Sequence, residues 1–250
     1  MLELQQLSRH FGGVKAVDTL DLTVRQGEIL GLIGPNGSGK STTVNLITGV
    51  YRPTAGTVRF MGRDVTALEP HQRSEIGIAR TFQNIRLFGH LTVWQNLWAA
   101  RVVRERGWAG FRQRWLSGAA AAREEAESLL AFGDLAHKRD MLAGNLAFGE
   151  QRRLELLRAA ASGAPLLLLD EPAAGMNAEE IQDLDQRIRS LRDQGRTILL
   201  IEHHMELVME VCDRVAVLNF GRKIAEGTPG EVQADAQVRA AYLGTESLTA

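Results

Sequence analysis

The feature that most constrains this chain is a glycine-rich turn between a short apolar run and a helical pattern. Glu28–Ile33 is the apolar run, and residues 34–41 read G-P-N-G-S-G-K-S. This segment fits the pattern G-x-x-x-x-G-K-[ST] in the strand, loop and helix context that the motif requires. Its glycines let backbone N–H groups curl around phosphate oxygens, and the helix that follows adds the positive end of its dipole. The sequence therefore predicts a phosphate-binding loop on an α/β core.

Individual residues of this loop have expected roles in holding a nucleoside triphosphate. Lys40 is expected to reach the β- and γ-phosphates, and Ser41 is placed to bind Mg²⁺. A glycine-rich turn that merely contains Lys-Ser is the alternative, and the flanking strand and helix argue against it. The remaining residues expected to line the nucleotide are Gly34, Pro35, Asn36, Gly37, Ser38, Gly39 and Thr42.

A second apolar strand ends in two carboxylates. Leu166–Leu169 is followed directly by Asp170 and Glu171. Asp170 can hold Mg²⁺ through water, and Glu171 then lies next to the place where a water would attack the γ-phosphate. A solvated strand end before Pro172 is the alternative, but the phosphate loop in the same chain favours catalysis. We therefore predict an ATP-hydrolysing site.

Strand and helix patterns alternate along most of the chain. Period-two alternation over residues 2–24 predicts an antiparallel pair, and helical spacing of apolar residues over 91–162 predicts a helical subdomain. We expect a single α/β domain, 1–250, with a mostly parallel sheet and an antiparallel edge. Its core is expected to comprise about 1–83 and 166–250, with the helical insertion over about 84–165. Strands are predicted at 28–33, 57–60, 78–82, 166–170, 197–202 and 215–220, and an Asn177-led helix follows the Asp-Glu strand.

Composition narrows the possible partners. The chain has 29 Lys and Arg against 30 Asp and Glu, for a net charge of -1, so no overall field attracts nucleic acid or anionic lipid. The single cysteine, Cys212, cannot close an intrachain disulfide and is expected to be a buried, inert thiol in a reducing compartment. The N-terminus lacks the apolar run of a secretory signal, and the longest apolar runs are far shorter than a spanning helix. We expect a cytoplasmic protein that reaches a membrane only through a partner.

Residues 146–153, L-A-F-G-E-Q-R-R, lie between the two nucleotide motifs. In that order, the three motifs resemble the nucleotide-binding subunits of ABC transporters, whose signature is L-S-G-G-Q. The resemblance implies a P-loop NTPase core of ABC type and a head-to-tail dimer in which the signature of one subunit covers the γ-phosphate bound to the other. Ala147, Gly149 and Glu150 would then contact nucleotide. At three positions the sequence departs from the family signature: Ala147 replaces serine, Phe148 replaces glycine and Glu150 replaces glutamine.

Further positions match this family one residue at a time. Gln83 resembles the glutamine of the Q-loop, which approaches Mg²⁺ and a membrane-facing groove, and a surface amide is the alternative. His203 resembles the switch histidine that contacts the γ-phosphate, whereas His204 is expected to begin the next helix. Phe11 resembles the aromatic residue that stacks on adenine, with core packing as an equal alternative. Residues 173–177 resemble the D-loop at the dimer interface, and Asn177 is also expected to cap its helix.

The Arg- and aromatic-rich segment Arg101–Arg114 can be read in two ways. Arginines and aromatics together could meet a membrane surface, a partner helix or nucleic acid. A solvated helix face is favoured, because the run is short and the protein is neutral. Trp94 and Trp98, one helical turn apart, are expected to pack in the core.

The resemblance implies partners that this chain does not itself contain. These are integral membrane permease subunits, a second ATP-binding subunit that is identical or related, and an extracytoplasmic solute-binding protein, with no nucleic acid. The chain would lie on the cytoplasmic face of the inner membrane, with ATP and Mg²⁺ as its ligands. Residues 146–155, 171–175, 201–203 and 227–244 look most like importers of branched-chain amino acids, so the expected cargo is these amino acids or related small polar solutes. Residues 107–118 resemble an insertion of the longer of the two ATP-binding subunits of such importers. Another ABC system such as lipid export, or a soluble non-transport ABC ATPase, is the alternative.

Overall fold

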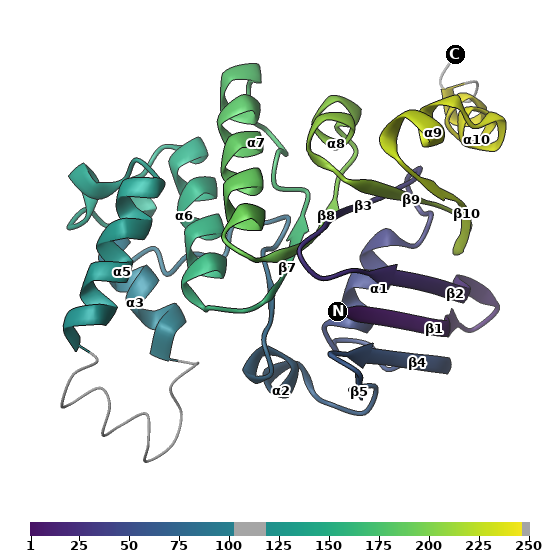
Figure 1. Cartoon of the computed structure of the whole chain (residues 1–250), viewed down its shortest axis with the longest axis horizontal. Helices are drawn as coiled ribbons and strands as arrows, with labels where there is room; N and C mark the ends of the chain where they lie inside the picture. The colour runs from purple at the N-terminus through teal and green to yellow at the C-terminus, as the bar shows by residue number, and fades with distance from the viewer. Residues whose placement is uncertain (103–118, 247–250) are drawn as a thin grey trace.

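A computed structural model describes residues 1–102 and 119–246 of the chain. Two β-sheets pack on either side of one helix, and a group of helices extends from one end (Figure 1). The smaller sheet is antiparallel with the strand order β2-β1-β4-β5. Leu2 pairs with Val24 and Leu4 with Leu22, which confirms the antiparallel pair predicted from the alternation. Its strands are β1 (Leu2–Phe11), β2 (Val14–Val24), β4 (Ala55–Phe60) and β5 (Arg63–Asp64).

The larger sheet has the strand order β10-β9-β3-β8-β7-β6. All its neighbours are parallel except β10 and β9. Every residue of β3, β7 and β8 is buried, as expected for parallel strands covered on both faces. The mixed α/β fold predicted from the alternation is therefore confirmed. The strands are β3 (Ile29–Ile33), β6 (Ile78–Arg80), β7 (Leu166–Asp170), β8 (Thr197–Ile201), β9 (Arg214–Asn219) and β10 (Arg222–Gly227).

Most of the predicted strands differ from the structure by one or two residues at their ends. β3 begins at Ile29, one residue after the predicted start, and β8 ends at Ile201, one residue before the predicted end. The largest shortening is in the strand predicted before Gln83. The apolar pattern predicts a strand over 78–82, but β6 ends at Arg80. The Thr81 N–H still reaches Leu168 O at 2.9 Å, whereas the Phe82 N–H turns to the Glu155 side chain at 3.4 Å. A side chain on a distant helix thus ends the strand.

The helices cover both faces of the larger sheet (Figure 1). Helix α1 (Lys40–Ile47) lies between the two sheets, where its Val44, Leu46 and Ile47 join one continuous apolar core with both. On the opposite face, a second core joins the sheet to several helices. These helices are α6 (Phe148–Ala161), α7 (Ala178–Asp193), α8 (Met205–Val211), α9 (Pro229–Ala234) and α10 (Ala236–Glu246); α2 (Pro70–Glu75) precedes β6.

A third apolar cluster holds α3 (Val93–Val102), α5 (Ala119–Phe132) and α6 together. Trp94 and Trp98 stack with ring centroids 6.1 Å apart, and Trp94 packs on this cluster. Trp94, which is half-buried, therefore packs against the apolar cluster as predicted, whereas Trp98 is half-buried and contacts Trp94 at the edge of that cluster. Two short 3₁₀ helices, η2 (Ala136–Lys138) and η3 (Ala143–Asn145), lead into α6. Most of the arginine-rich stretch and the predicted insertion at 107–118 fall within 103–118, outside the described residues.

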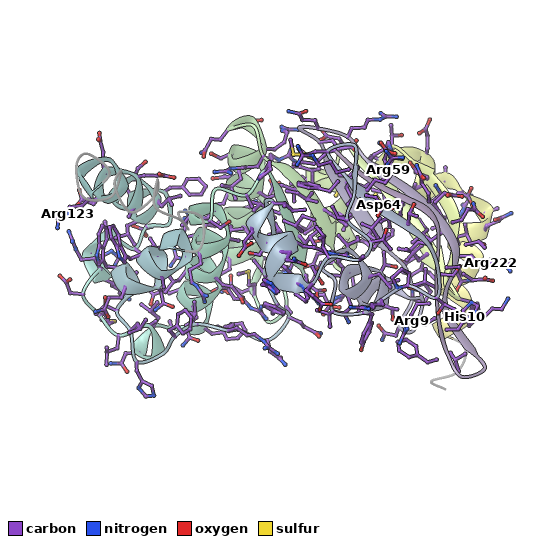
Figure 2. All side chains as sticks on the ribbon, turned by 90° about the horizontal axis from the view of Figure 1, so that it is seen from below. Arg9, His10, Arg59, Asp64, Arg123 and Arg222 are labelled. Carbon is purple, nitrogen blue, oxygen red and sulfur yellow. The ribbon has the colours of Figure 1, made fainter. Side chains whose placement is uncertain are left out.

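An ion pair joins the edges of the two sheets. Asp18 on β2 binds Arg222 at the start of β10, with Arg222 Nη2 2.6 Å from Asp18 Oδ2. Arg222 lies at one side of the molecule, away from Arg123 at the far end of the helical group (Figure 2).

Within 1–102 and 119–246, no helix is both long and apolar enough to cross a membrane.

Cys212 is buried, and its Sγ approaches the backbone of Gly31 closely. Burial raises the pKa of its thiol well above the ordinary value, so the reactive thiolate form is disfavoured. The expected interior position of Cys212 is confirmed, and its inertness stays a prediction.

Candidate active site

The predicted site residues follow strands that lie side by side in the larger sheet. The phosphate loop follows β3, the Asp170-Glu171 pair ends β7, and His203 follows β8. Gln83 follows β6, which pairs with β7. Because the carboxyl ends of parallel strands meet at one edge, these residues converge there. The order β3-β8-β7-β6 thus assembles one site from four distant parts of the sequence.

The phosphate loop folds as a tight cradle. Gly34 has φ +149°, and a Cβ atom there would lie 2.1 Å from Leu218 O, so only glycine fits. Ser38 is 2% exposed, and no group in the described part of the chain hydrogen-bonds its buried Oγ. A buried hydroxyl without a partner is costly unless a ligand supplies one. Ser38 therefore fits a loop that receives phosphate oxygens.

Lys40 is buried inside this loop. Its Nζ donates to Gly34 O at 2.6 Å and to Pro35 O at 3.1 Å. Desolvation lowers the pKa of the ammonium, while the carboxylates of Glu171 and Asp170 oppose that shift. Neutral carbonyl groups thus hold the lysine side chain within the loop. From this position its ammonium group can donate hydrogen bonds to phosphate oxygens instead. Ser41 is exposed in the first turn of α1, and Thr42 beside it is half-buried.

Asp170 has a partner that the sequence did not predict. Arg80, at the end of β6, donates from Nη2 to Asp170 Oδ2 at 2.7 Å and from Nη1 to Asn45 Oδ1 at 2.7 Å. Both members of the ion pair are largely buried. Arg80 therefore ties the carboxylate to α1 and fixes its orientation. The sequence shows an arginine three residues before Gln83. No local pattern, however, indicates that this arginine pairs with Asp170, which lies 90 positions away in the sequence.

Glu171 lies between Gln83 and His203. Gln83 Nε2 donates to Glu171 Oε2 at 2.6 Å, and His203 Nδ1 lies 3.9 Å from the same oxygen. The backbone of Glu171 has φ +50°, a conformation uncommon outside glycine. Such strained residues cluster at functional sites. The structure thus brings together the three side chains that the sequence assigned to hydrolysis and to the Q-loop.

Glu202 is a second residue whose role the sequence did not reveal. Its side chain is fully buried. Oε1 accepts from the Ala173 N–H at 2.8 Å, and Oε2 accepts from the backbone N–H groups of His203 and His204 at 3.0 and 3.2 Å. One carboxylate therefore fixes both the D-loop and the turn that carries His203. His204 is the N-cap residue of α8, as expected of a helix start.

The signature residues form the N-terminus of α6. Ala147 is the N-cap residue, and its N–H donates to Glu150 Oε2 at 3.0 Å. Glu150 Oε1 also binds Lys138 Nζ at 2.5 Å. Burial works to raise the pKa of Glu150, but these two hydrogen bonds hold it below its ordinary value. Glu150 is thus committed to its own helix end, and its contact with nucleotide, like those of Ala147 and Gly149, remains a prediction.

Phe148 is the signature residue whose ring lies against the D-loop. Its side chain is 48% exposed, and its ring edge would lie 3.0 Å from a Cβ atom on Gly175. On the other side of the signature, Gly149 lies so close to Glu180 Oε1 that a Cβ atom would be 2.1 Å away. Glu180 and Asn177 cap α7 reciprocally at 2.9 and 3.0 Å, which confirms the predicted N-cap. The signature and the D-loop are therefore in direct contact within one chain.

Phe11 is the last residue of β1 and is 40% exposed, so it does not lie in the core. Tyr51 meets its ring edge-on with centroids 5.4 Å apart, and the Arg9 guanidinium lies 4.5 Å from its centroid. Arg9 and the neighbouring His10 are at the same end of the smaller sheet (Figure 2). An exposed ring leaves adenine stacking open, and that role remains a prediction.

The donor set also fits a magnesium ion. Ser41, Gln83 and Asp170 offer a hydroxyl, an amide and a carboxylate oxygen, which are the ligands that Mg²⁺ prefers beside substrate phosphates. Arg80 holds only the Oδ2 atom of Asp170. A carboxylate has a second oxygen that can accept from a metal-bound water.

Comparison with known proteins decides the family. A family model described as ABC transporter matches residues 17–174. This chain belongs to the ABC transporter family. As an ATP-binding cassette it is an ATPase. A second model, described as branched-chain amino acid ATP-binding cassette transporter, matches residues 222–247.

Relatives of this ABC ATPase match it along nearly its whole length. The high-affinity branched-chain amino acid transport ATP-binding protein LivG of Salmonella typhimurium is 42% identical, over 98% of each chain. BraF of Pseudomonas aeruginosa, which carries the same description, is 40% identical with the same coverage. The lipopolysaccharide export system ATP-binding protein LptB of Haemophilus influenzae is 35% identical. Among solved structures, the ADP conformation of MJ1267, an ATP-binding cassette of an ABC transporter, has a TM-score of 0.86 at 32% identity and 98% coverage of both chains.

Proposed function

We propose that this chain is the ATP-hydrolysing subunit of an importer of branched-chain amino acids. The observation that carries the proposal is the match of residues 222–247 to the branched-chain amino acid transporter model. This segment comprises all of β10, then α9 and α10, and it lies outside the nucleotide motifs described above. The identity of 42% to LivG over the whole chain supports the same substrate class.

In the proposed reaction, each side chain at the sheet edge has a distinct task. Lys40 and the loop N–H groups bind the β- and γ-phosphates of ATP. Glu171 accepts a proton from the attacking water, or orients that water. Gln83 holds the Glu171 carboxylate, and His203 contacts the γ-phosphate. Mg²⁺, held by Ser41, Gln83 and Asp170, would neutralise charge on the phosphates when bound.

The partners follow from the proposed transport role. Integral membrane permease subunits would form the translocation path, and a solute-binding protein outside the cytoplasm would deliver the amino acid. A cavity of about 550 Å³ lies beside β6, between α2 and α6, and is lined in part by Phe82, Arg86, Glu155 and Arg158. We propose that a permease segment docks there, next to Gln83. The chain would then lie on the cytoplasmic face of the inner membrane.

Uptake of radiolabelled leucine, isoleucine and valine tests the proposed cargo. Deletion of the gene should abolish high-affinity uptake, and the wild-type chain should restore it. Lys40→Ala should fail to restore it, whereas Arg63→Ala, which removes a positive charge from exposed β5, should succeed.

Undiminished uptake of all three amino acids in the deletion strain would refute the cargo assignment. If lipopolysaccharide export failed in that strain, lipid export, the function in the printed name of the relative LptB, would replace amino acid import as the proposed function. Neither result would contradict the conclusion that the chain is an ATPase.

A further inference from the structure

Three charged side chains on one face of α6 reach the chain segment that carries Gln83. Arg152, Glu155 and Arg158 are three residues apart in this helix, a spacing that places them on the same side. The segment they reach, residues 82–86, follows β6 and is here called the Q-segment. Its residues, all of them described, belong to no helix or strand.

The three side chains bind backbone groups of the Q-segment rather than its side chains. Arg152 donates from Nη1 to Phe82 O at 3.2 Å and from Nη2 to Gln83 O at 2.6 Å. Glu155 Oε1 accepts from Phe82 N–H at 3.4 Å and from Arg86 N–H at 3.3 Å. Arg158 donates from Nη1 to Arg86 O at 2.5 Å. The helix therefore supplies the hydrogen bonds that a strand partner would otherwise give.

Two of these side chains are buried as an ion pair. The side chains of Arg152 and Glu155 are each 7% exposed, and Arg152 Nη1 lies 3.6 Å from Glu155 Oε2. Charges removed from water need well-placed partners, and here the partners include the Q-segment backbone. A shift of the Q-segment would thus leave both charges with fewer hydrogen bonds. The pair holds the segment in one place.

The held segment leads directly to the catalytic carboxylate. Gln83 lies in the segment, and its Nε2 atom is 2.6 Å from Glu171 Oε2. We propose that Arg152 and Glu155 are positioning residues for ATP hydrolysis, which fix the Q-segment so that Gln83 keeps the Glu171 carboxylate in place. This proposal rests on the proposed role of Glu171 as the residue that activates water.

A double-mutant cycle between Arg152 and Gln83 tests the proposal in the full-length chain. Arg152→Met should lower kcat for ATP hydrolysis by about ten- to hundredfold, since small displacements of a reacting group have effects of this order, with ATP affinity unchanged. In a Gln83→Ala background, the same substitution should lower kcat by less than about twofold, because its effect passes through Gln83. An equal loss in both backgrounds, or no loss in either, would overturn the proposal.

Conservative variants separate hydrogen bonding from packing. Glu155→Gln keeps an oxygen that can accept from both N–H groups and should retain more activity than Glu155→Ala. Arg152→Lys should retain part of the activity lost in Arg152→Met, because its ammonium can still donate to one carbonyl. Equal loss in the conservative and truncated variants would contradict the proposed hydrogen-bonding role. These milder variants also keep the test valid if Arg152→Met does not fold.

Amide hydrogen exchange gives a readout that does not depend on turnover. In Glu155→Ala, the amides of Phe82 and Arg86 should exchange faster, whereas Arg123→Met on α5 should leave them unchanged. Arg123 is exposed at the far end of the helical group (Figure 2). Unchanged exchange in Glu155→Ala would overturn the proposal even if Glu171 is catalytic. Normal turnover in Glu171→Gln, with faster exchange in Glu155→Ala, would refute the assigned role of Glu171 and the link to hydrolysis, and would leave only the hydrogen bonding of the Q-segment by Glu155.

Discussion

The side-chain amide of Gln83 donates a hydrogen bond of 2.6 Å to the Oε2 atom of Glu171. Gln83 follows β6 and Glu171 follows β7, two paired strands, so the bond depends on the sheet order. Because the amide holds one carboxylate oxygen, the other is left to meet a water. The two residues therefore form one functional unit at the edge of the sheet.

Glu171→Gln should abolish most ATP hydrolysis and leave ATP binding intact. The substitution keeps the shape of the side chain but removes its basicity, and a positioned acid-base group accounts for about 10²–10⁴-fold in rate. Phosphate release measures turnover, and equilibrium binding of a fluorescent ATP analogue measures affinity. Turnover close to that of the wild type would show that Glu171 does not activate water.

Gln83→Ala should lower kcat by about ten- to hundredfold, because the Glu171 carboxylate loses the donor that fixes it. The matched control is Asn84→Ala, which truncates the exposed neighbour of Gln83. If both variants hydrolyse ATP equally well, the hydrogen bond to Glu171 has no part in catalysis.

Lys40→Ala should weaken ATP binding itself. Hydrogen bonds from a charged donor contribute about 1.5–3 kcal/mol, which corresponds to about ten- to hundredfold in affinity. Its Nζ already lies among the loop carbonyls of Gly34 and Pro35, so the charge is in place before phosphate arrives. Titration calorimetry with ATP, beside Arg63→Ala as the control for charge, measures the change. An unaltered Kd would count against the role assigned to Lys40.

Local patterns made most of this site predictable. The phosphate loop and the Asp170-Glu171 strand end each occupy a short stretch whose residue types dictate both backbone and chemistry. Parallel strands then bring their carboxyl ends together without further information. The convergence of Lys40, Glu171 and His203 therefore follows from pattern and topology.

What escaped sequence reasoning depends on tertiary neighbours. Arg80 meets Asp170 across 90 positions, and Glu202 is buried against the N–H groups of two loops. Likewise, Glu150 turns to Lys138 and its own helix end. Each of these polar residues looks like a surface residue in the sequence, because hydrophobic periodicity carries no information about which charges are paired.

Gly175→Ala should destabilise the chain, because Gly175 has φ +79° and its new Cβ atom would lie 3.0 Å from the Phe148 ring. The left-handed backbone alone costs roughly 1–2 kcal/mol for a residue with a Cβ atom. In a chain of this size, each kcal/mol lowers Tm by about 2–4 °C. Thermal unfolding measures the shift.

Gly195→Ala is the matched control for that variant. Gly195 has φ +88°, and no atom lies within 4 Å of its added Cβ. Gly175→Ala should therefore lower Tm more than Gly195→Ala, and Phe148→Ala should reduce the difference. Equal shifts at both glycines would mean that the D-loop does not press on the signature phenylalanine.

The Asp18–Arg222 pair should make stability depend on pH at acid values. The hydrogen bond from Arg222 lowers the pKa of the Asp18 carboxyl in the folded chain. The stability it contributes is therefore fully present above the unfolded pKa of about 3.9 and is lost as pH falls through the lower folded value. Asp18→Asn should unfold more easily than the wild type at pH 7, and the two should converge in strong acid. Urea unfolding across this range checks the prediction, and a constant difference at all pH values would contradict it.

ATP should drive two copies of the chain into a dimer. The signature residues at the start of α6 contact the D-loop of their own chain through Phe148, and the family resemblance assigns them to the nucleotide of a second subunit. Since hydrolysis would end the complex, Glu171→Gln with ATP should run as a dimer in size exclusion with light scattering, and ADP should give monomers. Adding Lys40→Ala should prevent the dimer by weakening ATP binding.

A second variant tests whether the signature lies in the dimer interface. Because Phe148 is 48% exposed, Phe148→Asp should weaken the dimer and leave the ATP affinity of the monomer unchanged. A Glu171→Gln chain that stays monomeric at high protein and ATP concentration would rule out the homodimer as the working unit and would point to a related second subunit.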